Sequence, residues 1–119
     1  MRFEDKVAVV TGAGTGIGKA TALAFAREGA SVVIADIDIK SAEAVTKEIK
    51  SLGRKALTIK ADVSNKPDVV QMVDKVVKEF GKIDILVNNA GVVVVCPTEE
   101  LAEADWDKVV SVDLKGTFL

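Results

Sequence analysis

Four glycines lie within a stretch of seven residues, and their spacing is the clearest chemical signal in the sequence. Gly12, Gly14, Gly16 and Gly18 follow a short valine-rich run and precede an alanine-rich stretch. Glycine lets backbone N–H groups approach an anion with no Cβ in between, and the N-terminus of a helix attracts negative charge. The cluster therefore predicts a loop that binds nucleotide phosphates, whereas a plain turn would need only about one or two glycines.

Three phosphate-binding templates can be tested against this cluster. The triphosphate P-loop, aligned on Gly18-Lys19, requires glycine at position 13 and serine or threonine at position 20, where the sequence has Ala13 and Ala20. The dinucleotide pattern G-x-G-x-x-G, counted from the first glycine of the cluster, places Ile17 where the third glycine belongs. The pattern T-G-x-x-x-G-x-G fits at every position, through Thr11, Gly12, Gly16 and Gly18.

An aspartate, Asp36, follows the second expected strand, 18 residues after Gly18. At the end of such a strand a carboxylate can accept hydrogen bonds from both hydroxyls of an adenosine ribose, and it repels a 2′-phosphate. Ile37 follows, and positions 13 and 15 provide no arginine or lysine inside the loop. Asp36 therefore predicts NAD rather than NADP. The nearby Lys40 argues the other way, and a solvated acid at a strand end is the alternative interpretation.

Polar residues also follow the third and fourth expected strands. Asp62 comes directly after the third strand, where it either faces a ligand or only leads the chain toward the next helix ahead of Ser64. Asn88 and Asn89 follow an apolar run, and amides at a buried strand end need hydrogen-bond partners. We expect these two asparagines to tie neighbouring strands together.

Short β-branched runs alternate with longer helical periods, which is typical of βαβ units and a parallel sheet. Strands are predicted at 6–10, 31–35, 57–61 and 83–87. The first helix is predicted at 17–28, and the second has the apolar stripe Ala42, Val45, Ile49 and Leu52 before Gly53. The third, capped by Ser64 or Asn65, has the buried stripe Val69, Met72, Val73, Val76, Val77 and Phe80 before Gly81. The last runs from about 104 to the end, with Trp106, Val109, Val110 and Leu114 as its apolar positions.

Right-handed crossovers between these strands give a parallel sheet in the order 3-2-1-4. The fold class is therefore α/β: a Rossmann-like, doubly wound sheet limited to about four strands, with helices on both faces. We expect residues 1–119 to form this single domain, and the ligand crevice to lie between strands 1 and 4, where the strand order reverses.

Composition narrows the choice of partners. The chain has 119 residues, 16 basic and 18 acidic, for a formal net charge of −2, and no histidine. A balanced charge argues against nucleic acid, which needs a basic face, and without histidine we expect no metal site. Cys96 is the only cysteine, so it forms no internal disulfide, and with no histidine base it is expected to pack rather than react. The single cysteine favours a reducing, cytoplasmic setting, and no apolar run approaches the roughly 18 residues of a membrane span, so we expect no membrane contact.

Five motifs occur in order along the chain. They are Thr11-Gly12-x-x-x-Gly16-x-Gly18, Asp36, Asp62-Val63, Asn88-Asn89-Ala90-Gly91 and Val112-Asp113-Leu114-Lys115-Gly116. In this combination the chain resembles the N-terminal, NAD-binding half of the short-chain dehydrogenase/reductase family. The resemblance implies that NAD is bound by Gly12, Thr15, Gly16, Ile17, Gly18, Asp36, Ile37, Asp62, Val63, Asn89, Ala90, Gly91 and Val112. It further implies that Asp62 bonds the adenine amine, that Val63 flanks the ring and that the backbone of 89–91 lines a cofactor ribose.

The resemblance also implies an activity. Family members protonate the substrate oxygen with the tyrosine of a Tyr-x-x-x-Lys motif, assisted by a serine, and these residues would lie beyond the last helix of this chain. The 119 residues contain no tyrosine. Asp113 stands where the family usually has a catalytic asparagine, and its spacing from Trp106 and Val109 predicts that it lies on the inward face of the last helix. We expect a fragment, inactive by itself, of an NAD-dependent oxidoreductase acting on a small alcohol or carbonyl substrate. A non-catalytic NAD-binding or interaction module is the first alternative, and a P-loop NTPase is the second.

The edge of the predicted sheet favours self-association. The fourth strand has no further strand beside it, so the backbone groups of 83–87 lack partners on that edge. Trp106, Val110, Leu114 and Phe118 give the last helix an apolar face. We expect a homo-oligomer assembled through these two surfaces and away from the glycine loop.

Overall fold

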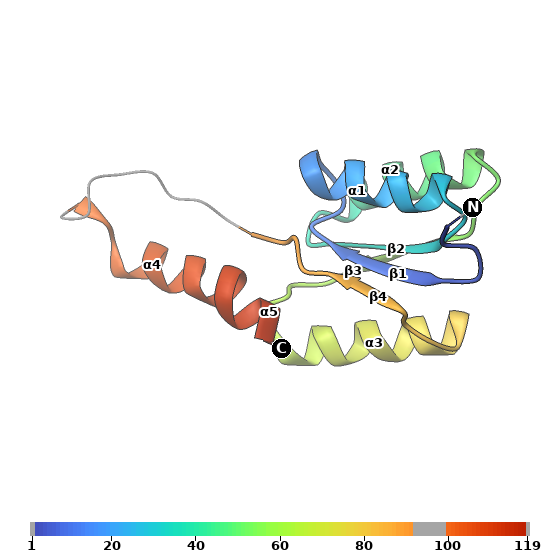
Figure 1. The fold of residues 1–119 in the computed structure, drawn as a ribbon. Helices are drawn as coiled ribbons and strands as arrows, with labels where there is room; N and C mark the ends of the chain where they lie inside the picture. The colour runs from blue at the N-terminus through green and yellow to red at the C-terminus, as the bar shows by residue number, and fades with distance from the viewer. Residues whose placement is uncertain (1, 92–99, 119) are drawn as a thin grey trace.

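The computed structural model describes residues 2–91 and 100–118 of the chain. The elements in chain order are β1 (Val7–Thr11), α1 (Gly16–Arg27), β2 (Ser31–Asp36), α2 (Ile39–Ser51), β3 (Ala56–Lys60), α3 (Lys66–Phe80), β4 (Ile85–Val87), α4 (Glu103–Val109), the π-helical segment η2 (Val110–Lys115) and α5 (Gly116–Phe118). The four strands are parallel, in the order β3-β2-β1-β4. Figure 1 shows α1 and α2 on one face of the sheet and α3 on the other, so the predicted doubly wound α/β fold is confirmed.

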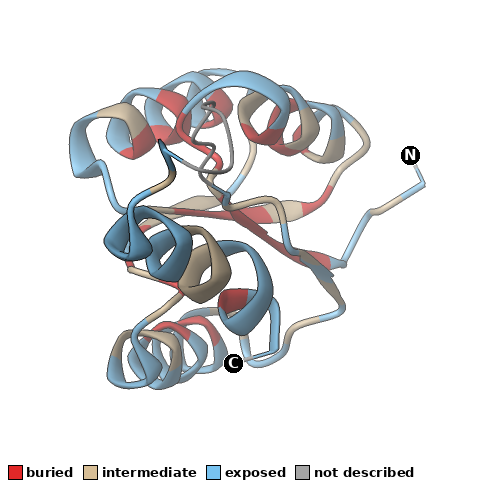
Figure 2. Ribbon diagram, turned by 90° about the vertical axis from the view of Figure 1, so that its left-hand side faces the viewer, coloured by how far each residue is buried: buried red, intermediate tan, exposed pale blue. Residues whose placement is uncertain are grey.

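Alternate residues of the strands fill two separate cores, one on each face of the sheet. Ala8 and Val10 of β1 pack with Ile34 of β2 beneath α1 and α2, and every one of these three side chains is fully buried. Val9 of β1 packs toward α3, where Met72 is buried. The alternation follows from the period of two along a strand, and because both faces are covered the strands read as continuous apolar runs. Figure 2 shows the buried residues concentrated in the sheet and on the helix faces toward it.

The starts of α2 and α3 are fixed by side-chain caps. Asp38 caps α2 by accepting hydrogen bonds from the N–H groups of Lys40 at 3.1 Å and Ser41 at 3.3 Å. Asn65 caps α3 by accepting from the N–H of Asp68 at 3.1 Å, so of the two predicted caps Asn65 is the correct one. Both caps satisfy N–H groups that the first turn of a helix leaves without partners.

The predicted apolar stripe of α3 is only partly buried. Met72 and Val76 are buried, whereas Val73 and Val77 are exposed. Each residue turns the direction of a helical side chain by about 100°, so a helix that meets the sheet along a single row leaves the adjacent row outside the contact. Leu52, predicted to end the stripe of α2, is also exposed, because it is the C-cap residue beyond the last turn of the helix.

The last helix is not uniform, in contrast to the prediction. Its first seven residues form α4, and the chain then widens into η2 before returning to an α-helical turn. Figure 1 shows this helical region extending away from the edge of the sheet. Trp106, Leu114 and Phe118 are all exposed, so their predicted apolar face is not buried within the chain.

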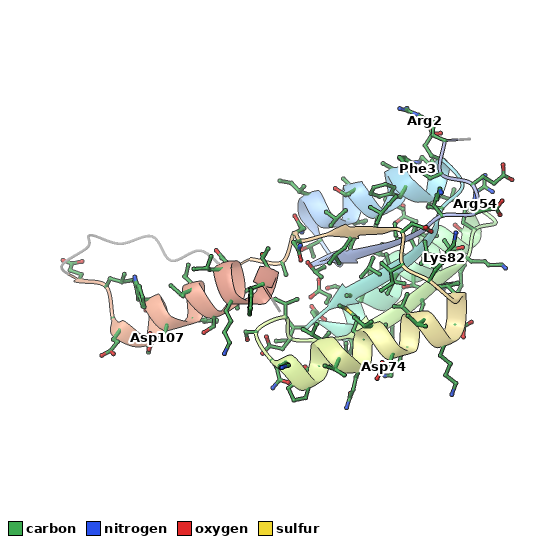
Figure 3. All side chains as sticks on the ribbon, turned by 60° about the horizontal axis from the view of Figure 1, so that its bottom comes forward. Arg2, Phe3, Arg54, Asp74, Lys82 and Asp107 are labelled. Carbon is green, nitrogen blue, oxygen red and sulfur yellow. The ribbon has the colours of Figure 1, made fainter. Side chains whose placement is uncertain are left out.

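The start of β4 is tied to the start of β1 at the opposite end from the glycine loop. Asp84 Oδ2 accepts a hydrogen bond from the Val7 N–H at 2.8 Å and lies 3.1 Å from Lys82 Nζ. Lys82, labelled in Figure 3, also donates to the Asp5 carbonyl oxygen at 2.6 Å. The N–H of Val7 and the ammonium of Lys82 hold the pKa of Asp84 below its ordinary value, since both stabilise the carboxylate.

Candidate nucleotide-binding site

A cavity of about 640 Å³ lies at the carboxyl ends of the strands. Its walls come from the loops after β1, β2, β3 and β4 and from the last helical region. The lining residues are Gly12, Thr15, Gly16, Ile17, Asp36, Ile37, Ala61, Asp62, Val63, Ser64, Asn89, Ala90, Gly91, Lys108, Ser111 and Val112. Every residue predicted to bind the cofactor is in this set except Gly18. Segments far apart in the sequence therefore meet at the point where the strand order reverses, the usual ligand position in such sheets.

Thr11 joins the glycine loop to the loop after β4. Its side-chain oxygen accepts hydrogen bonds from the backbone N–H groups of Asn89 and Ala90, both at 3.0 Å. Its hydroxyl also donates a hydrogen bond to the Val87 carbonyl oxygen at 3.3 Å. Asn89 adds a hydrogen bond that its side-chain amide nitrogen, Nδ2, donates to the Gly12 carbonyl oxygen at 3.2 Å. The expectation that the asparagine pair ties strands together holds for Asn89, whereas Asn88 is exposed.

The glycines of the loop have different structural roles. Gly12 has φ +62°, and a Cβ there would lie 3.0 Å from the Cα of Ala90, so it allows the two loops to pack together. A Cβ on Gly18 would overlap the Gly12 carbonyl oxygen, so this buried glycine lets α1 approach the loop although it does not line the cavity. Gly16 has φ +57° and no atom within 4 Å of an added Cβ. Of the three, Gly16 is therefore the one where a side chain would enter open space.

The start of α1 differs from those of α2 and α3. Thr15 is the N-cap residue of α1, but its side chain makes no capping hydrogen bond. The free N–H groups at the first turn carry the positive end of the helix dipole toward the cavity lined by Thr15, Gly16 and Ile17. This arrangement can accept the negative charge of a phosphate.

Asp36 is held in place by the backbone on two sides. Its Oδ2 accepts from the Gly14 N–H at 2.9 Å, and its Oδ1 accepts from the Asp38 N–H at 2.9 Å. The neighbouring Asp38 carboxylate accepts from the hydroxyl and the N–H of Ser41 and from the N–H of Lys40, and these bonds lower the pKa of Asp38. Asp36 and Asp38 thus lie two residues apart at the entrance to α2, and Asp36 lines the cavity.

Asp62 both lines the cavity and forms the turn before α3. Its Oδ1 accepts from the N–H of Ser64 at 2.9 Å and from the Ser64 hydroxyl at 2.6 Å, while its own N–H donates to Asp68 Oδ2 at 3.0 Å. The two interpretations of Asp62 left open by the sequence are compatible, because one carboxylate oxygen forms the turn and the residue still lines the cavity.

Asp113 does not lie where its helical spacing places it. It is exposed rather than on an inward face, as is Trp106, because this helical region extends away from the edge of the sheet (Figure 1). Its carboxylate lies beside the loop after β4, since a Cβ on Gly91 would be 3.2 Å from Asp113 Oδ1. Its carbonyl oxygen accepts from the Thr117 hydroxyl at 3.2 Å. Asp113 does not line the cavity, although Val112 does.

Several residues of the site were not predicted from the sequence. Gly14 is buried and donates a hydrogen bond to Asp36, and the available signal was that it is the one glycine of the cluster that the T-G-x-x-x-G-x-G pattern does not require. Lys108 and Ser111 line the cavity together with Val112. Ser111 and Val112 follow Lys108 by three and four residues, a spacing that places all three on one face of a helix. This spacing was the signal in the sequence that could have predicted Lys108 and Ser111 as site residues. Ala61 and Ser64, which flank the predicted Asp62-Val63 pair, complete the unpredicted part of the lining.

The described residues contain no group of three side chains able to hold a metal ion. Among those same residues, no helix is long and apolar enough to span a bilayer. Cys96, expected to pack without reacting, lies outside residues 2–91 and 100–118.

A parallel sheet in this order, with a glycine loop and a cavity at its carboxyl ends, defines a Rossmann-like α/β domain. The profile of the short chain dehydrogenase family matches residues 6–119, and the chain belongs to that family. This membership contradicts the P-loop NTPase alternative.

Individual relatives agree with the family match. The chain is 47% identical over its full length to (2S)-[(R)-hydroxy(phenyl)methyl]succinyl-CoA dehydrogenase subunit BbsD of Thauera aromatica, of which it covers 48%. It is 43% identical, over 99% of its length, to 3-oxoacyl-[acyl-carrier-protein] reductase FabG of Thermotoga maritima, again covering 48%. The crystal structure of a short chain dehydrogenase from Mycobacterium avium matches with a TM-score of 0.95 and 38% identity, over 99% of this chain and 44% of that one. The chain therefore spans about half the length of the curated relatives it matches.

Proposed function

We propose that the chain binds NAD(H) as the nucleotide-binding part of an oxidoreductase that acts on an alcohol or carbonyl group. The observation that supports NAD over NADP is the Asp36 carboxylate, which lines the cavity and is held there by two backbone N–H groups. A 2′-phosphate beside this carboxylate would be repelled. Positions 13 and 15 of the loop supply no cation to offset that repulsion.

The cavity fits the chemistry of a dinucleotide. The uncapped start of α1 and the glycines that line the cavity suit a pyrophosphate, because backbone N–H groups there have no side chain in front of them. Asp36 would accept from the adenosine ribose, Asp62 would face the adenine amine and Val63 would lie against the ring. The backbone of 89–91 and the side chain of Val112 would line the remaining cofactor surface. When bound, NAD supplies the hydride acceptor, and this chain's residues bind and orient it.

The whole protein's substrate is a small alcohol or carbonyl compound in this proposal. One relative is named as a dehydrogenase of a hydroxyl-bearing succinyl-CoA and another as a reductase of a 3-oxoacyl-carrier protein. The 119 residues contain no tyrosine to donate a proton to the substrate oxygen, and Asp113 does not line the cavity. The chain by itself therefore binds cofactor without turning over an alcohol. NADH formation from any alcohol by the purified chain, free of host enzyme, would contradict this.

Titration with NADH and NADPH, followed by nucleotide fluorescence, tests the cofactor assignment. NADH should bind at least about tenfold tighter, because a single charge repulsion of about 1.4 kcal/mol gives that ratio. Asp36→Ala should reduce the ratio. Asp74→Ala removes one negative charge from the exposed outer side of α3, labelled in Figure 3, and should leave the ratio unchanged. Equal affinities of the unchanged chain for the two nucleotides would overturn the assignment.

A non-catalytic NAD-binding module is the second candidate, favoured by Asp113, which places a carboxylate where the family usually has a catalytic asparagine. Both candidates share the binding site, so binding alone does not separate them. Joining the chain to the C-terminal half of a homologous dehydrogenase that carries serine and Tyr-x-x-x-Lys discriminates: NAD-dependent alcohol oxidation supports the oxidoreductase. The module is supported if the chimera folds and binds NADH but shows no turnover at a protein concentration at which the homologue's native enzyme is active.

Self-association and a cytoplasmic location are further parts of the proposal. In the described sheet β4 pairs with β1 alone, so its other edge is open to a second copy. Trp106, Leu114 and Phe118 are 55%, 69% and 86% exposed, which is costly for apolar side chains in water. A homo-oligomer that buries these surfaces agrees with both observations, and a single cysteine suits a reducing compartment.

A further inference from the structure

Gly14 occupies one of the variable positions of the T-G-x-x-x-G-x-G pattern, yet it touches the residue on which cofactor choice depends. Its N–H donates to Asp36 Oδ2 at 2.9 Å, and the N–H of Asp38 donates to Oδ1 at 2.9 Å. Each carboxylate oxygen of Asp36 is therefore held by a different backbone donor. Rotation of this side chain would break at least one charge-assisted hydrogen bond.

Only glycine leaves room for this arrangement. A Cβ on Gly14 would lie 2.8 Å from Asp36 Oδ2 and 2.8 Å from the Cβ of Ser41, and 3.3 Å from the backbone nitrogen of Ala42. Ser41 and Ala42 belong to the first turn of α2, and Ala42 is buried in the core, so the helix cannot easily give way. Gly14 is not among the glycines with positive φ, so alanine is compatible with its backbone and only the contacts oppose it.

We propose that Gly14 is a positioning residue that sets the preference for NAD(H) over NADP(H) by holding the Asp36 carboxylate in the cavity. This inference rests on the proposed function. A carboxylate has about four acceptor sites, and the two backbone donors leave about two for the adjacent hydroxyls of a ribose. A 2′-phosphate would instead meet a negative charge that two hydrogen bonds hold in place.

Dissociation constants for NADH and NADPH, measured on the full chain and on a double-mutant cycle, test this role. Gly14→Ala should weaken NADH about tenfold and NADPH much less, so that a preference of about tenfold falls to about threefold or below. In the Asp36→Ala background, Gly14→Ala should not change the ratio further, because the group it positions is gone. Ser41→Ala keeps the Cβ that faces Gly14 and should keep the ratio. Thermal unfolding without nucleotide records any loss of stability separately.

A second variant separates position from charge without altering the loop. Asp36→Glu retains the negative charge but moves the carboxylate by one methylene, so both backbone bonds cannot be kept. Its NADH preference should fall toward that of Gly14→Ala. An unchanged ratio in Asp36→Glu, or equal weakening of both nucleotides in a folded Gly14→Ala chain, would overturn the inference and leave the proposed function standing. Failure of the unchanged chain to bind either nucleotide would overturn the proposed function itself, and this inference with it.

Discussion

Replacing Thr11 by valine tests whether one buried hydroxyl holds the cavity wall together. Thr11 is 3% exposed, and valine has nearly the same shape, so packing is preserved while the hydroxyl is lost. The Ala90 N–H would lose its acceptor, whereas the Asn89 N–H would keep the Val87 carbonyl oxygen at 3.1 Å. A donor left without a partner costs about 1–3 kcal/mol when buried, and this N–H is only partly buried, so we expect the free energy of unfolding to fall by about 1 kcal/mol or somewhat more.

Urea denaturation of the unchanged chain and of the Thr11→Val and Thr11→Ser variants measures this difference. Serine keeps the hydroxyl and removes one methyl group, which costs about 0.8 kcal/mol. Thr11→Val should therefore be the less stable of the two, and the amide of Ala90 should exchange with solvent faster in it. A Thr11→Val chain at least as stable as Thr11→Ser, with Ala90 exchange unchanged, would refute the role assigned to the hydroxyl.

Four further substitutions test the loop packing, the Asp84 hydrogen bond and the exposed apolar residues of the last helical region. Gly12→Val should lower the free energy of unfolding by about 3 kcal/mol or more, through the clash with Ala90 as well as backbone strain. Gly53 has φ +78° and open space around it, so Gly53→Val is a control that introduces the backbone strain alone. Equal losses of stability for the two variants in urea denaturation would contradict the clash. Asp84→Asn should lower the melting temperature at pH 7 but by less at pH 3: the lowered pKa of Asp84 means that its carboxylate stabilises the fold at neutral pH and loses this effect as pH falls through that pKa. Trp106→Ala and Phe118→Asp should weaken any oligomer seen by sedimentation at micromolar concentration, and a folded monomer in the unchanged chain would contradict self-association.

The strand order could be predicted because several independent sequence signals agree on it. Valine-rich runs buried on both faces, helical stretches of suitable length between them and a glycine cluster after the first run together leave few topologies for a parallel sheet. The observed strands differ from the predicted ones by one or two residues at their ends, as at β1, which includes Thr11 and not Lys6. That shift matters for the site, because it places Thr11 at the end of the strand, where its side chain reaches the loop after β4.

The errors arise where tertiary geometry overrides a regular period. The stripe of α3 was predicted from spacing alone, but spacing does not tell how wide a surface the sheet offers, and Val73 lies beyond it. Asp113 was placed on the same inward face as Trp106, but this helical region extends away from the sheet and both residues are exposed. The glycine pattern likewise does not tell which glycine faces open space: a Cβ on Gly12 would point at Ala90, whereas one on Gly16 would meet no atom within 4 Å.

The glycine loop is attached to the segments that follow β4 and β2, the two strands beside β1. These two attachments hold the loop in place although its glycines have no side chains. On the β4 side, Thr11 bonds the N–H groups of the loop that contains Ala90. On the β2 side, Gly14 bonds the carboxylate of Asp36. The first attachment joins a wall of the cavity to the sheet, and the second orients the group that faces a ribose. Loss of the first should therefore reduce stability and the affinity for both nucleotides together, while loss of the second should change mainly the choice between them.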